Sequence, residues 1–144
     1  MQSRWSDIEA KQLTDKYGQW EDLALRTYSS RLIGGEASLV LHGGGNTSVK
    51  GTAVNVFGER VPAVFVKASG HDLATIEPEG HPPLDLEYLR RLRALPDLGD
   101  EAMRNEIRTH LFRYDDPTPS IEALVHAFLP PRFIDHTHAD AILG

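Results

Sequence analysis

The chain has no cysteine among its 144 residues. Disulfide bonds and thiolate metal sites are therefore excluded, so any metal must be held by histidine, aspartate or glutamate. The sequence also has no apolar run near the ~20 residues that a membrane-spanning helix needs, and it shows no secretory signal pattern at its N-terminus. We therefore expect a cytoplasmic protein that has no membrane partner.

Basic residues are in the minority. Lysine and arginine total 15 against 21 aspartates and glutamates, which gives a net charge of −6. A nucleic-acid partner calls for a clustered basic face, so this composition argues against one. The hydrophobic fraction of 40% and the charged fraction of 25% are typical of a globular protein, and the length is that of about one domain.

Helical patterns frame a central block of strand patterns, without internal repeats or low-complexity segments. The capping box Ser6–Glu9 predicts a helix that starts near Asp7, and Gly34 and Gly35 end a second helical stripe. Further strands are expected at residues 38–42, 47–50, 53–57, 61–67 and 133–138, and further helices at residues 84–94, 100–113 and 120–129. This order predicts a layered α/β sandwich.

A glycine-rich turn follows the first of these strands, in the segment His42-Gly43-Gly44-Gly45-Asn46-Thr47-Ser48. Glycines let the backbone take positive φ and approach a ligand closely, and the exposed N–H groups of such a turn can bind an anion. The segment lacks the Gly-Lys-Ser/Thr of a Walker loop, and a strand follows it where a dinucleotide fingerprint needs a helix. The alternative is an ordinary hairpin turn without a ligand.

Two further turns have residues suited to an anion. Ser69 and Gly70 end a strand pattern and can donate hydrogen bonds to a phosphate, although Ser-Gly also marks ordinary turns. Ser120 precedes a helix pattern, and helix N-termini attract anions. Glu122 follows in the first turn, where it is a candidate general base or metal-site carboxylate, or simply a residue that favours the helix dipole. His126, one turn later, is expected to be structural.

His136 and His138 are one residue apart in the last strand pattern. Side chains alternate between the two faces of a strand, so both imidazoles point to the same side and form a two-point clamp for a divalent metal. Asp135 and Asp140 are candidate partners for these rings. A catalytic zinc normally has three protein ligands and an open fourth position. The chain is therefore expected to be the N-terminal part of a metalloenzyme whose metal site is incomplete.

Together, these four segments resemble the class II aldolase/adducin family. They stand in the family's order: a Gly-Asn-x-Ser loop, a strand that ends in Ser-Gly, a Ser-x-Glu helix start and His-x-His. The longer matches His-Gly-Gly-Gly-Asn-Thr-Ser, Lys-Ala-Ser-Gly, Pro-Ser-x-Glu and His-Thr-His-Ala-Asp-Ala are similar to the aldolase part of the bifunctional rhamnulose-1-phosphate aldolase/alcohol dehydrogenase type. The resemblance covers roughly Tyr28 to the end of the chain.

The resemblance implies a three-layer αβα sandwich around a mixed, largely antiparallel sheet. The residues that would bind the substrate phosphate are Gly45, Asn46, Ser69, Gly70 and Ser120. Glu122 would be the catalytic acid/base, and His136 and His138 would be two of three zinc-binding histidines. Ile121 replaces the second serine of the family's Ser-Ser-Glu, which removes one phosphate donor. The third histidine lies downstream in the family, so residues 1–144 are expected to be the N-terminal part of a single domain, truncated before its end and inactive by itself.

The implied reaction is the reversible cleavage of a ketose 1-phosphate, such as rhamnulose 1-phosphate, to dihydroxyacetone phosphate and an aldehyde. Cleavage leaves an ene-diolate, whose charge zinc stabilises as a Lewis acid, while a carboxylate such as Glu122 moves protons. A sugar-phosphate epimerase or dehydratase of the same superfamily, and a non-catalytic adducin-like domain, are the alternatives. The family also implies a homo-oligomer, typically a tetramer.

Overall fold

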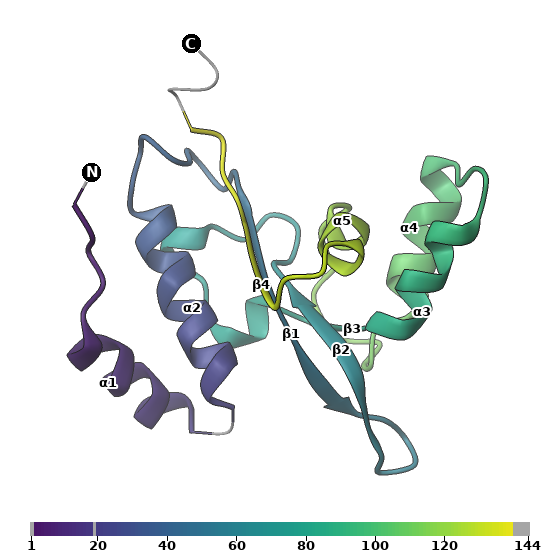
Figure 1. Ribbon diagram of the computed structural model, residues 1–144, viewed down its shortest axis with the longest axis horizontal. Helices are drawn as coiled ribbons and strands as arrows, with labels where there is room; N and C mark the ends of the chain where they lie inside the picture. The colour runs from purple at the N-terminus through teal and green to yellow at the C-terminus, as the bar shows by residue number, and fades with distance from the viewer. Residues whose placement is uncertain (1, 19, 140–144) are drawn as a thin grey trace.

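Helices cover both faces of one sheet in the computed structural model, which describes residues 2–18 and 20–139 (Figure 1). Helices α1 (Asp7–Tyr17) and α2 (Glu21–Gly34) lie on one side, and α3 (Leu86–Arg91), α4 (Asp100–Thr109) and α5 (Ala123–Phe128) lie on the other. Short 3₁₀ helices cover Leu73–Thr75, Pro78–Gly80 and Leu92–Ala94. The predicted layered sandwich is confirmed. No helix among the described residues is long and apolar enough to cross a bilayer.

The sheet has four strands in the order β3-β2-β1-β4, and each described pairing is antiparallel. The strands are β1 (Asn46–Val54), β2 (Arg60–Val66), β3 (Pro83–Asp85) and β4 (Phe133–His136). β1 and β2 form a hairpin. β4 comes from the far end of the sequence, pairs with the other edge of β1 and sets His136 opposite Asn46. This register brings the glycine-rich turn next to the predicted histidine pair.

Alternate residues of β2 point into two separate cores, as the period of a strand requires. Val64 and Val66 are buried in a cluster with apolar residues of α3, α4 and α5. Ala63 and Phe65 face the other way and pack against Trp20, at the start of α2. Because the centre of the sheet is buried on both faces, its ends are where a ligand can reach the strands.

The predicted N-terminal helices are confirmed, and the ends of α1 follow the expected chemistry. The Ser6 hydroxyl accepts a hydrogen bond from the Glu9 N–H and caps α1. Gly18 ends α1 in the left-handed conformation, which costs glycine little.

Several predicted boundaries are wrong. Residues 38–42 form turns and irregular backbone where a strand is expected. The strands expected at 47–50 and 53–57 join into the single strand β1, because Gly51 stays paired with Ala63 in the ladder. β1 ends at Val54, and residues 55–57 lie in the hairpin turn. The expected helix at 84–94 divides into β3, α3 and a 3₁₀ turn.

Candidate functional site

Lys67 ties the glycine-rich turn to the end of β2. Its side chain is 5% exposed, and its Nζ donates to the carbonyl oxygens of Gly43 at 2.8 Å and Gly45 at 3.2 Å. Burial lowers the pKa of Lys67, and attraction by Glu122 and Asp72 opposes that shift. The lysine therefore fixes the shape of the turn at the point where the sequence predicts an anion site.

Gly45 and Asn46 lead from this turn into β1. Gly45 has a φ of +71°, and an added Cβ would lie 2.6 Å from Val40 Cγ1 and 2.9 Å from the carbonyl oxygen of His136. Only glycine fits such a close approach. Asn46 is 1% exposed, and its Oδ1 has no hydrogen-bond partner among the described residues. An unpaired buried acceptor costs free energy, so Asn46 has hydrogen-bonding capacity that the described residues do not satisfy.

Backbone hydrogen bonds join the Ser-Gly turn after β2 to the segment before α5. The Ser69 N–H donates to the Thr118 carbonyl at 2.9 Å, and the Ser120 N–H donates to the Lys67 carbonyl at 3.2 Å. Ser69 and Gly70 are exposed, and Ser120 is partly exposed. The three turns that the sequence predicts to bind an anion are therefore linked through one residue, Lys67.

Helix α5 is shorter than predicted, with six residues from Ala123 to Phe128 where the sequence suggests 120–129. Ser120 is consequently not its N-cap. The Ser120 hydroxyl accepts a hydrogen bond from the Glu122 N–H at 3.2 Å, and Glu122 occupies the N-cap position. The predicted attraction of phosphate by a helix N-terminus is therefore not supported, and Ser120 offers only its own hydroxyl.

Glu122 lies between two histidines. Its Oε2 is 2.7 Å from Nδ1 of His136 on β4 and 3.9 Å from Nε2 of His126 on α5. The Glu122 side chain is 34% exposed and that of His136 is 44% exposed, so both are open to solvent. The carboxylate accepts a hydrogen bond from His136 Nδ1–H, which leaves Nε2 of a neutral ring free to bind a metal.

His136 and His138 come together as the sequence suggests, although β4 ends at His136. Their ring centroids are 4.9 Å apart, and both residues are exposed. The His138 N–H donates to the Leu39 carbonyl at 2.9 Å. An added Cβ on Gly44 would lie 3.7 Å from His138 Nδ1, so the second histidine rests against the glycine-rich turn.

Arg26 of α2 anchors β4 through a hydrogen bond and an ion pair. Its side chain is 1% exposed and donates to the carbonyl oxygens of Ser48 and Ile134, both at 3.4 Å. It also forms a 2.6 Å ion pair with Asp135. Asp135, a predicted partner of the histidine rings, is therefore engaged by Arg26. Asp140, the other predicted partner, lies outside the described residues.

The donor atoms of this site suit part of a zinc site. Imidazole nitrogens are common zinc ligands, and the adjacent rings of His136 and His138 are placed to share one ion. Glu122 takes the position of a carboxylate that orients a metal-binding histidine. Within residues 2–18 and 20–139, no cluster of three His, Asp or Glu side chains is arranged for a metal. The described residues therefore fit two ligands of a zinc site.

Sequence reasoning missed two residues that shape this site. Lys67 enters it only as part of the Lys-Ala-Ser-Gly match, and Arg26 is not singled out. The signal for Arg26 is weak: it follows Leu23 by one turn and so lies on the face of α2 that packs against the sheet. The sequence gives no signal for the role of Lys67, because the carbonyl groups that it binds are distant in the sequence.

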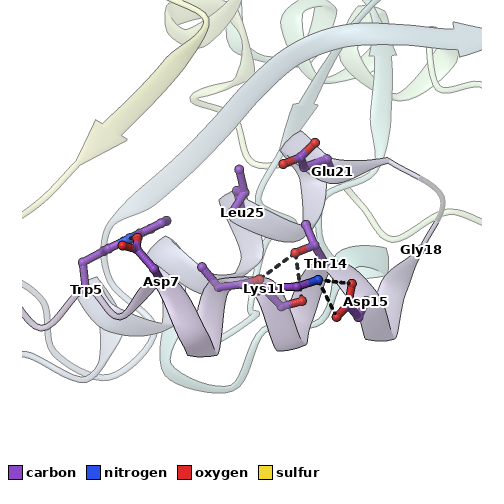
Figure 2. Close-up of a pocket in the computed structure, with 9 residues that line it drawn as sticks. Trp5, Asp7, Lys11, Thr14, Asp15, Gly18, Glu21 and Leu25 are labelled. Carbon is purple, nitrogen blue, oxygen red and sulfur yellow. Dashed lines mark hydrogen bonds and ion pairs between the residues drawn. The ribbon is translucent and has the colours of Figure 1, made fainter.

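Two hollows in the described surface lie away from these residues. One, of about 550 Å³, lies between α1 and α2, where Lys11 pairs with Asp15 (Figure 2). The other, of about 880 Å³, is lined by the start of α2, the C-terminal part of β1 and the loop before Pro117. The candidate site is instead an open surface at the opposite end of β1.

Comparison with known families matches residues 27–143 to the "Class II Aldolase and Adducin N-terminal domain". The chain belongs to this family. The match includes each candidate site residue from Gly45 to His138, and the layers and antiparallel sheet are those of a class II aldolase domain.

Two similar proteins have longer chains than this one. An uncharacterized oxidoreductase, YuxG, of Bacillus subtilis (strain 168) is 40% identical over 117 residues, which make up 81% of this chain and 17% of that protein. A solved structure of the N-terminal class II aldolase domain of a conserved protein from Thermoplasma acidophilum is 37% identical, with a TM-score of 0.86 over 99% of this chain and 62% of that chain. The chain thus spans less than two thirds of either relative.

Proposed function

We propose that the protein is a zinc-dependent sugar-phosphate aldolase. Its reaction is the reversible cleavage of a ketose 1-phosphate, such as rhamnulose 1-phosphate, to dihydroxyacetone phosphate and an aldehyde. The observation that carries the proposal is the 2.7 Å contact between Glu122 Oε2 and His136 Nδ1, with the ring of His138 alongside. A proton-transfer group beside two candidate metal ligands is the combination that an aldol cleavage needs.

Glu122 is the proton carrier in this proposal. Its carboxylate is 34% exposed, so Oε2 can reach both a substrate and solvent. Oε2 takes a proton from the reacting hydroxyl and returns one to the reacting carbon, which is general acid–base catalysis. His136 Nδ1–H holds the same oxygen in place between these steps.

The turns linked by Lys67 bind the substrate phosphate. Gly45 permits a close approach of the backbone, and the hydroxyls of Ser69 and Ser120 are accessible. Ile121 has no hydrogen-bond donor in its side chain, so this anion site relies on fewer hydroxyls than the Ser-Ser-Glu pattern provides. Phosphate contacts distant from the reacting bond fix the pose of the substrate and supply binding energy.

His136 and His138 hold the metal, together with ligands from outside the described residues. A bound zinc supplies Lewis-acid stabilisation of the negative charge that develops on substrate oxygens. The protein's own contribution is to hold the two imidazoles next to each other, and Arg26 supports this by anchoring β4 through Ile134 and Asp135.

The test is a retro-aldol assay on the full-length, zinc-loaded protein. Rhamnulose 1-phosphate and other ketose 1-phosphates are offered, and dihydroxyacetone phosphate is measured with a coupled reductase. We expect release of dihydroxyacetone phosphate that chelation abolishes and zinc restores. His136→Ala and His138→Ala should lose both zinc and activity. His110→Ala is the matched control, because His110 lies against Tyr88 at the end of α4, away from the site.

Other products of the same assay would contradict the proposal. Formation of an isomeric sugar phosphate indicates an epimerase, and loss of water indicates a dehydratase. The absence of any turnover by the zinc-loaded protein, with substrate phosphate still bound, indicates a non-catalytic adducin-like domain.

A further inference from the structure

A buried histidine lies behind Glu122, and the proposed reaction gives it no role. His126 is 1% exposed, and its Nδ1 is 2.7 Å from Ser48 Oγ on β1. Its Nε2 faces Glu122 Oε2 at 3.9 Å. The same carboxylate oxygen contacts His136 Nδ1 at 2.7 Å. A row of four polar side chains thus runs from the interior of the sheet to the exposed histidine pair.

The partners of His126 determine which ring nitrogen carries the hydrogen. Burial lowers the pKa of His126 to about 4, against the attraction of Glu122, so the ring is neutral at pH 7 and has one N–H. An ionised carboxylate can only accept hydrogen bonds. The N–H therefore belongs on Nε2, which faces Glu122, because the other tautomer would point a nitrogen lone pair at a negative charge. Nδ1 then accepts from the Ser48 hydroxyl, whose side chain is fully buried on β1.

We propose that His126 is a positioning residue that presents Nε2–H to Glu122 and, with Ser48 behind it, keeps the carboxylate turned toward His136. The inference rests on the proposed function, in which Glu122 is the acid/base. At 3.9 Å the two groups attract each other without a direct hydrogen bond. His126 is not itself catalytic, because it is buried beneath the carboxylate that meets the substrate.

The geometry explains why a half-exposed glutamate needs such support. The Glu122 side chain has several rotatable bonds, and it lies at the N-cap of a helix of only six residues. Misplacement of a catalytic group by ~1 Å can cost about 100-fold in rate. His126 lies one helical turn away on α5, and Ser48 connects its ring to the central strand of the sheet. The position of the Glu122 carboxylate is therefore fixed relative to β1 as well as to β4.

Two substitutions separate positioning from packing. Asparagine places its amide near the position of Nδ1, so His126→Asn keeps a partner for Ser48 and loses the group that faces Glu122. Glutamine places its amide N–H near the position of Nε2, so His126→Gln keeps the donor toward Glu122. We expect His126→Asn to lower kcat by about tenfold or more, with KM nearly unchanged and a similar unfolding midpoint in both variants. His126→Gln should recover most of kcat. An equal loss in both variants, in proportion to lost stability, overturns the proposal.

Measurements without substrate keep this inference separate from the proposed function. In ¹⁵N NMR of the imidazole rings, wild-type His126 should be the Nε2–H tautomer, and Ser48→Ala should weaken that preference. In crystal structures, Glu122 should keep its contact with His136 in His126→Gln and lose it in His126→Asn. An Nδ1–H tautomer in the wild type, or an unmoved Glu122 in His126→Asn, overturns the positioning role. If both measurements agree with expectation and no ketose phosphate is cleaved, the proposed function fails while His126 still positions Glu122.

Discussion

Glu122 is the residue on which the proposed chemistry depends most directly. Glutamine has the same shape and can still accept a hydrogen bond from His136, so Glu122→Gln should leave the fold and KM nearly unchanged. Removal of a general acid/base lowers turnover by about two orders of magnitude or more. The measurement is steady-state kcat and KM of the zinc-loaded full-length protein, with the exposed Glu101→Gln in the first turn of α4 as control. If Glu122→Gln stays within a few-fold of wild type, the residue serves only the N-cap of α5.

His81 makes the folded state sensitive to acid. It is 1% exposed, and its Nε2 is 3.0 Å from Thr47 Oγ1. Burial lowers the pKa of His81 from 6.5 to about 3. Below pH 6.5 the His81 ring is protonated in the unfolded chain but stays neutral in the folded chain. The contribution of His81 to stability is therefore fully present above pH 6.5 and decreases as the pH falls toward 3. The loss is about 1.4 kcal/mol per pH unit for this one histidine.

Urea unfolding at pH 7 and pH 5 measures this effect. We expect the free energy of unfolding to fall by about 2 kcal/mol through His81. His81→Asn should reduce the pH dependence by this amount, whatever it does to stability at pH 7, while the buried His126, whose pKa is also lowered, keeps its own contribution. His42→Asn is the control, because His42 is exposed and has a φ of 45°, which asparagine tolerates. An equal pH dependence in wild type and His81→Asn would contradict the prediction.

Among elements, β1 packs tightly against the start of α2 at Gly51. An added Cβ there would lie 2.3 Å from Trp20 Cζ2 and 2.5 Å from Cη2. Gly51→Ala should destabilise the protein by roughly 1–3 kcal/mol, the usual range for overpacking. Chemical denaturation of Gly51→Ala, Trp20→Leu and the double variant forms a double-mutant cycle. In the double variant, the smaller leucine should recover much of the stability that Gly51→Ala loses. Gly99→Ala is the control, since nothing lies within 4 Å of its Cβ position, and an equal effect there would contradict the steric explanation.

The sequence predicts elements well where local chemistry decides them. The Ser6 cap and Gly18 define α1 because their hydrogen bonds are made within a few residues. The helix predicted at residues 84–94 is wrong at its start, because Pro83–Asp85 pairs with β2, and no local pattern predicts a strand that short. The predicted start of α5 is also too early, because the Ser120 hydroxyl bonds Glu122 in a turn before the helix begins.

At the scale of the whole molecule, three turns distant in sequence meet around Lys67. A bound phosphate would connect them and would bind only the folded state. We expect inorganic phosphate to raise the unfolding midpoint, with about 2.7 kcal/mol of stabilisation at a concentration 100 times Kd. Thermal unfolding across a phosphate titration measures it, and Ser120→Ala should reduce the shift. Ser38→Ala, on the exposed surface, should not. The same shift in both variants would exclude the phosphate site at Ser120.

The order of helices and strands predicts the layers of the whole fold, because each layer buries one side of the sheet. The motifs also predict which residues gather at the site: the glycine turn and the histidine pair are adjacent. The register of β4 against β1 cannot be derived this way, because pairing between distant segments depends on tertiary packing. The roles of Arg26 and Lys67 cannot be derived from the sequence either, since their partners are known only once the chain is folded.

The position of β4 also sets the order of events on the ribosome. The β1–β2 hairpin is complete as soon as Val66 has emerged, but the partner of its other edge is translated only at residues 133–136. A nascent chain therefore carries an open strand edge, of the kind that invites pairing with another chain, and it has no histidine clamp. Under the proposed function, zinc binding requires both His136 and His138, so it would follow the translation of residue 138.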